Sequence, residues 1–115
     1  MIVEDDADTL AGMFTMFTTA GYSVLTADNG QQAVDLLERG IRPRIILIDL
    51  MMPKVSGEEL IDYLRGDPEL KHIPTIVVTG MPKDQVRVIA DAVFHKPLNF
   101  ATLLETVNGY SDRPH

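Results

Sequence analysis

Three acidic residues and two hydrogen-bond donors are the side chains of this sequence best suited to chemistry. The acids are Glu4, Asp5 and Asp49, and the donors are the hydroxyl of Thr79 and the ammonium of Lys96. Carboxylate oxygens without histidine or cysteine partners favour Mg²⁺, or Mn²⁺ in its place, and Mg²⁺ often shares its site with a phosphate. Carboxylates also form acyl phosphates, which makes Asp49 the candidate nucleophile. Lys96 and Thr79 would then neutralise the phosphoryl oxygens.

Each of these residues taken alone has an ordinary structural explanation. An aspartate at a strand end is more often a turn or capping residue, a Lys-Pro pair usually marks a turn, and threonine is common in strands. Acids at positions 4 to 6 also suit the start of a helix, and that is the role expected of Asp6 and Asp8. The prediction therefore depends on all the candidates reaching one edge of the fold.

The elements that would bring them together alternate between strand-like and helix-like periodicity, which indicates an α/β domain with a parallel sheet. Strands are expected at residues 1–3, 23–27, 44–50, 74–78 and 91–94, with helices between them that end at Gly21, Gly40 and Gly66. Ser56 and Glu59 have capping-box spacing, and Asn99 is expected to cap the last helix. In a doubly wound sheet, ligands bind beyond the carboxyl ends of the strands, where the candidate residues fall.

Length and composition limit the other function classes. The 115 residues, 45% of them hydrophobic, suit a single domain over residues 1–115, with about 109–115 as a frayed tail. With no cysteine, disulfides, thiolate metal sites and cysteine nucleophiles are excluded. A net charge of −7 argues against direct nucleic-acid binding.

The start of the chain bears on its location. The acids at positions 4 to 6 leave no room for a signal peptide, and no apolar run reaches membrane-span length, which predicts a cytoplasmic protein without membrane contact. A first strand at residues 1–3 is shorter than the ~5–6 residues usual for a strand. We therefore expect residues upstream of this sequence.

Four short segments together carry a resemblance to a known family. They are Ile2-Val3-Glu4-Asp5-Asp6, Ile46-Leu47-Ile48-Asp49-Leu50-Met51-Met52-Pro53 with Gly57, Val77-Val78-Thr79-Gly80, and Lys96-Pro97. Their order resembles the receiver domain of two-component response regulators over nearly the whole chain. The resemblance implies a flavodoxin-like, doubly wound sheet of five parallel strands in the order 2-1-3-4-5. It also implies phosphorylation by a histidine kinase or a histidine phosphotransfer protein.

The resemblance gives each candidate residue a role. It implies that the metal is bound by Glu4, Asp5, Asp49 and the Met51 backbone carbonyl, and that Asp49 is also the phosphoacceptor. It further implies that the Thr79 hydroxyl moves toward the phosphoryl group and that Lys96 forms an ion pair with it. Gly80 stands where the family has a small residue, which leaves room for the phosphoryl group. The Lys96-Pro97 peptide is expected to be cis, as it commonly is in the family.

The second half of the chain departs from the family pattern. Val93 stands where the family usually has an aromatic residue, with Phe94 next to it, and Leu98 stands where phenylalanine is frequent. The chain between Thr79 and Lys96 is also short, so the fourth helix is expected to be abbreviated to one or two turns after Pro82. Signal output is therefore expected through a reshaped surface of the fourth and fifth helices.

Two other functions stay open from the sequence. One is a receiver-like scaffold that binds partners without phosphorylation, which the departure at Val93 favours. The other is a Mg²⁺-dependent phosphohydrolase of the haloacid-dehalogenase type, but Met51 stands where such enzymes have a second aspartate. The leading hypothesis is a signalling domain whose only chemistry is gaining and slowly losing a phosphoryl group. The cognate kinase and the downstream partner are not specified, and a homodimer is left open.

Overall fold

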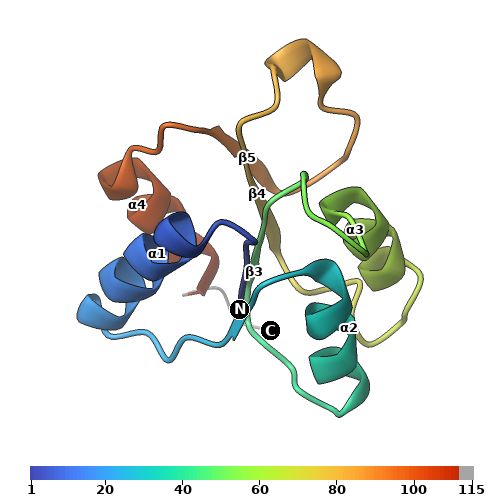
Figure 1. The fold of residues 1–115 in the computed structure, drawn as a ribbon. Coiled ribbons are helices and arrows are strands. Elements are labelled where there is room, and N and C mark those ends of the chain that lie inside the picture. The colour runs from blue at the N-terminus through green and yellow to red at the C-terminus, as the bar shows by residue number, and fades with distance from the viewer. Residues whose placement is uncertain (112–115) are drawn as a thin grey trace.

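The sheet consists of five short parallel strands in the order β2-β1-β3-β4-β5 (Figure 1). A computed structural model describes residues 1–111. The strands are β1 (Ile2–Val3), β2 (Thr26–Ala27), β3 (Ile46–Ile48), β4 (Thr75–Thr79) and β5 (Ala92–His95). Parallel pairing aligns Val3 with both Ala27 and Ile48, and it aligns Thr79 with His95. The predicted flavodoxin-like order is confirmed.

Within the described residues, four α-helices cover the sheet, two on each face. They are α1 (Ala7–Thr19), α2 (Gly30–Glu38), α3 (Gly57–Arg65) and α4 (Phe100–Ser111). Figure 1 shows α1 and α4 on one side of the sheet and α2 and α3 on the other. Asp6, Asn29 and Ser56 cap the first three helices, each accepting a hydrogen bond from a backbone N–H three residues ahead. The capping box predicted at Ser56 and Glu59 is present in full.

Two hydrophobic clusters fill the space between the sheet and the two helix layers. Side chains alternate along a strand, so Ile46 and Ile48 of β3 pack with α2 and α3 while Leu47 packs with α1 and α4. The strand β3 is fully buried on both faces, as its run of apolar residues indicates. This rigid central strand carries Asp49 at its end.

The helix predicted to follow Pro82, between β4 and β5, is abbreviated as expected. Its place is taken by a loop with one 3₁₀ turn, η1 (Lys83–Gln85), which projects at the top of Figure 1. The loop ends at Asp91, which makes two hydrogen bonds with Thr75. The Asp91 backbone N–H donates to the Thr75 carbonyl at 2.9 Å, and the Thr75 N–H donates to the Asp91 carboxylate at 2.8 Å. Asp91 thereby sets the register in which β5 joins β4.

Some of the predicted boundaries were wrong, including those of the third strand, which was expected over residues 44–50 but covers Ile46–Ile48. The second strand was expected from residue 23, but it pairs only from Thr26, because β1 offers no partner before Ile2. The frayed tail expected at about 109–115 stays a prediction; at its start, α4 continues to Ser111, and the Tyr110 hydroxyl donates to the Asp91 carbonyl at 3.1 Å. Residues 112–115 lie outside the described part.

Within residues 1–111, every helix is too short or too polar to cross a lipid bilayer.

Candidate functional site

Three carboxylates meet at the carboxyl edge of the sheet. Glu4 and Asp5 follow β1, and Asp49 follows the adjacent strand β3, because the parallel register places Val3 beside Ile48. One oxygen from each of the three groups lies within 4.8 Å of the others. Glu4 and Asp49 are buried, and Asp5 is exposed. The arrangement is an all-oxygen donor set open to solvent on one side, which suits a hard divalent cation.

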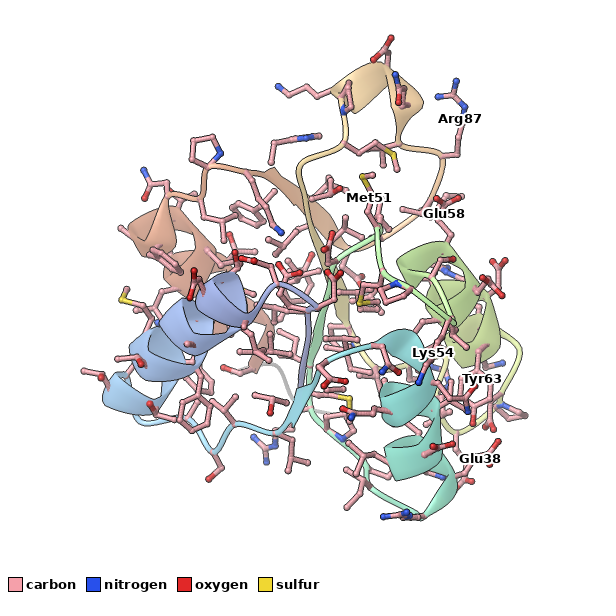
Figure 2. All side chains as sticks on the ribbon, viewed as in Figure 1. Glu38, Met51, Lys54, Glu58, Tyr63 and Arg87 are labelled. Carbon is pink, nitrogen blue, oxygen red and sulfur yellow. The ribbon has the colours of Figure 1, made fainter. Side chains whose placement is uncertain are left out.

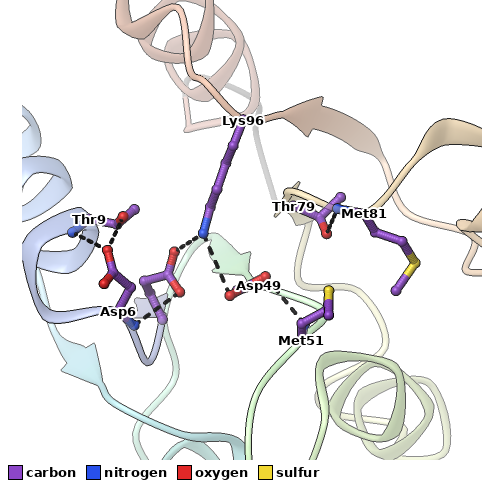
Figure 3. A network of polar contacts seen from close by, with 8 residues as sticks. Asp6, Thr9, Asp49, Met51, Thr79, Met81 and Lys96 are labelled. Atoms are coloured by element: carbon purple, nitrogen blue, oxygen red, sulfur yellow. Dashed lines mark hydrogen bonds and ion pairs between the residues drawn. The ribbon is translucent and has the colours of Figure 1, made fainter.

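The ammonium of Lys96 lies between two of these carboxylates. Its Nζ lies 2.5 Å from Glu4 Oε1 and 3.7 Å from Asp49 Oδ2 (Figure 3). Lys96 directly follows β5, and its backbone N–H donates to the Thr79 carbonyl at 2.8 Å, which fixes the start of the side chain. The Lys96-Pro97 peptide is cis, as predicted. A positive point charge is thus held against the acids by two neighbouring strands.

The charges of this cluster shift one another's pKa values. Burial, together with the neighbouring Asp49 carboxyl, raises the pKa of Glu4, and the hydrogen bond from Lys96 offsets this only in part. Burial by itself would lower the pKa of Lys96, but its hydrogen bond to Glu4 and the charge of Asp49 outweigh that effect and raise it. The two buried acids, Glu4 and Asp49, face a single ammonium, that of Lys96. The negative charge that is left over favours the binding of a cation.

The loop after Asp49 is tightly packed at both of its ends. At its start, an added methyl on Gly57 would overlap the Asp49 carbonyl oxygen and lie 2.6 Å from Leu50 Cα. At its end, an added methyl on Gly30 would overlap the Val55 carbonyl oxygen. The amino ends of α2 and α3 therefore hold the loop at backbone contact distance. Sequence analysis included Gly57 in the motif but missed the role of Gly30, which only its contact with a loop distant in sequence reveals.

The other predicted residues follow or end strands at the same edge of the sheet. The backbone N–H of Met51 donates to Asp49 Oδ1 at 3.3 Å, while the Met51 side chain is exposed (Figures 2 and 3). Thr79 is fully buried at the end of β4, and its hydroxyl accepts a hydrogen bond from Met81 N at 3.0 Å. An added methyl on Gly80 would meet no atom within 4 Å, so packing alone does not require glycine there. The role of the Met51 carbonyl as a metal ligand stays a prediction.

The position at which the family usually carries an aromatic residue is half open to solvent. Val93 is 37% exposed, on the face of β5 that the shortened segment between β4 and β5 leaves uncovered. Phe94 points to the opposite face and packs in the cluster of α1 and α4. The neighbouring aromatic therefore cannot replace the missing one.

Comparisons with known proteins agree with this geometry. The family model "Response regulator receiver domain" matches residues 1–108. The polar-differentiation response regulator DivK of Brucella anthropi is 36% identical over 115 residues, covering 96% of this chain and 93% of the relative.

Two solved structures are also similar. The signal receiver domain of a histidine kinase from Syntrophus aciditrophicus has a TM-score of 0.90 at 28% identity, over 99% of this chain and 92% of that one. The receiver domain of a sensor histidine kinase from Pseudomonas aeruginosa, which has a magnesium ion coordinated in its active-site cleft, has a TM-score of 0.87 at 24% identity, over 97% and 94%. The chain therefore belongs to the response-regulator receiver domains of two-component signalling.

Proposed function

We propose that this receiver domain takes a phosphoryl group on Asp49 in a Mg²⁺-dependent reaction and relays the signal by a conformational change. The observation that carries the proposal is the meeting of three carboxylates within 4.8 Å, with the Lys96 ammonium between Glu4 and Asp49. Such a cluster is costly to assemble without a further cation, because like charges repel in a partly buried site. Asp49, which directly follows the buried central strand β3, is the acid best placed to act as nucleophile.

The donor set fits magnesium better than other common metals. Carboxylate oxygens from Glu4, Asp5 and Asp49 are hard ligands, and the exposed side at Asp5 leaves space for the waters that Mg²⁺ retains. Mn²⁺ accepts the same ligands and would serve in its place. When bound, the metal neutralises charge on the acids and on the entering phosphoryl group.

In the proposed reaction, a carboxylate oxygen of Asp49 attacks phosphorus. The new P–O bond forms as the P–N bond of a phosphohistidine donor breaks, and the leaving imidazole nitrogen keeps the electron pair and takes a proton from water. The Lys96 ammonium and the Thr79 hydroxyl donate hydrogen bonds to the phosphoryl oxygens. A carboxylate nucleophile has no proton to lose, so the proposed reaction needs no general base.

Membership of the receiver family supports the choice of donor. A histidine kinase or a histidine phosphotransfer protein would supply the phosphoryl group, and the output partner would read the reshaped surface around η1. The aspartyl phosphate would carry ≈ −1.5 to −2 charge where the carboxylate carried −1, together with the phosphoryl oxygens, and this change draws Lys96 and Thr79 toward it. We therefore expect output to originate where Thr79 and Lys96 are attached, at the ends of β4 and β5.

Incubation with acetyl phosphate and Mg²⁺, read by intact mass, tests the proposal. We expect a labile gain of one phosphoryl group that disappears in Asp49→Asn and in EDTA. Asp62→Asn is the matched control, since it removes an exposed acid on α3 away from the cluster. Unchanged mass in the wild type with Mg²⁺ bound would favour the unphosphorylated scaffold that Val93 suggests, and labelling that survives Asp49→Asn would reject Asp49 as acceptor.

A further inference from the structure

His95 contacts the turn that follows β4. It lies on β5 one residue before Lys96, directly opposite Thr79 in the parallel register. Its ring Nδ1 lies 3.1 Å from the carbonyl oxygen of Met81. A carbonyl oxygen can only accept, so Nδ1 must carry the proton and donate it. No local sequence pattern points to this contact, because Met81 and His95 lie fourteen residues apart.

The peptide groups of Met81 are held on both sides. Its carbonyl accepts from His95, and its N–H donates to the Thr79 hydroxyl oxygen at 3.0 Å. Because the N–H of Met81 occupies one lone pair of that oxygen, the hydroxyl proton is directed elsewhere. The backbone of Thr79 is fixed separately, by the hydrogen bond from Lys96 N at 2.8 Å. Figure 3 shows the hydrogen bond from the Met81 N–H to the Thr79 hydroxyl.

The hydrogen bond between His95 and Met81 matters more because the helix expected between β4 and β5 is reduced to a short turn. In place of a helix, the segment after Thr79 has a single 3₁₀ turn without a side-chain cap, and residues 82–85 are exposed. Val93, which shares a face of β5 with His95, is apolar and has no group to hold the Met81 carbonyl. His95 thus links β5 to this turn by a hydrogen bond to Met81, which in turn donates to the Thr79 hydroxyl.

We propose that His95 is a positioning residue for the phosphoryl-accepting site. By donating Nδ1–H to the Met81 carbonyl, it keeps the Met81 N–H on Thr79 and so directs the Thr79 proton toward the phosphoryl group on Asp49. The proposal rests on the proposed function of Asp49. It adds a residue that touches neither metal nor phosphoryl group and acts through Thr79 alone.

Substitutions that separate the hydrogen bond from the ring test the proposal. His95→Phe keeps a ring but removes the donor, and His95→Asn places an amide N–H where Nδ1 stands. Measured by intact mass with acetyl phosphate and Mg²⁺, the rate of phosphoryl gain should fall about threefold to tenfold in His95→Phe, the factor expected for one lost hydrogen bond. His95→Asn should restore most of the rate. His72→Phe, at an exposed histidine before β4, is the matched control and should react like the wild type.

A double-substitution cycle locates the effect. In a Thr79→Val background, which has no hydroxyl to direct, His95→Phe should cause no further slowing. The same slowing in both backgrounds, equal rates in His95→Phe and the wild type, or failure of His95→Asn to restore the rate would each overturn the proposal. If the wild type itself gains no phosphoryl group, the proposed function fails instead.

A measurement on the unsubstituted protein covers the case in which His95→Phe does not fold. Long-range ¹H–¹⁵N NMR distinguishes the two imidazole tautomers, and we expect the neutral ring of His95 to carry its proton on Nδ1. A proton on Nε2 would remove the hydrogen bond to Met81, and the proposal with it.

Discussion

Gly57 offers a direct test of how closely α3 packs against the strand that carries Asp49. A methyl group added there would overlap the carbonyl oxygen of Asp49, and it would lie 2.6 Å from Leu50 Cα and 2.9 Å from the Asp49 carbonyl carbon. All three atoms belong to the backbone, so no side chain can rotate to make room. Gly57→Ala must therefore displace either α3 or the end of β3.

The cost can be worked from these contacts. Restoring an ordinary carbon–carbon contact of ~3.5 Å requires a movement of roughly 1 Å. If α3 retreats, Leu60, Ile61 and Leu64 lose part of their packing, since all three are buried against the sheet. Forcing an extra methyl into a packed core typically costs about 1–3 kcal/mol. The preference of helices for alanine over glycine returns at most ~1 kcal/mol. We expect a net loss of about 1–2 kcal/mol.

Urea denaturation followed by circular dichroism measures this loss, and phosphoryl gain from acetyl phosphate measures its effect on Asp49. Gly12→Ala is the matched control, because a methyl there meets no atom within 4 Å in the middle of α1. The control should be stabilised by roughly 0.5–1 kcal/mol, so the same chemical change has opposite signs at the two sites. A Gly57→Ala protein as stable as the wild type, with normal phosphoryl gain, would refute the packing argument.

Three further predictions concern the acid cluster and the loop. Mg²⁺ at a hundred times its dissociation constant should stabilise the wild type by ≈ 2.7 kcal/mol in thermal denaturation. Asp5→Asn should lose most of this gain but be more stable than the wild type in EDTA, because it removes a like charge from the cluster. Equal gains in the two proteins would exclude Asp5 as a ligand. Lys96→Met should destabilise the metal-free protein by about 3 kcal/mol in urea denaturation, because it leaves the buried Glu4 without its partner. Adding Glu4→Gln should recover part of this loss, and a loss that Glu4→Gln leaves unchanged would contradict the prediction. Gly30→Ala should destabilise by about 1–3 kcal/mol in the same assay, through its clash with the Val55 carbonyl; no change would mean that the loop yields.

The sequence alone was enough to predict the fold and the acids. Alternating periodicities indicate a parallel α/β sheet, and in such a sheet the residues that follow neighbouring strands must lie at one edge. That rule brought Glu4, Asp5, Asp49 and Lys96 together before any coordinates were considered. The short segment between Thr79 and Lys96 likewise predicted that the helix after Pro82 would be abbreviated, since chain length limits what can be built there.

The tertiary structure decided which contacts the chain makes between distant segments. Only the folded packing shows that Gly30 must be small, because its neighbour Val55 comes from another element. Only the pairing of β4 with β5 places the ring of His95 against Met81, fourteen residues earlier in the chain. Local patterns encode helices, strands and their order. Close approaches between backbones and single side-chain hydrogen bonds depend on how those elements dock, and that is settled only when the whole domain packs.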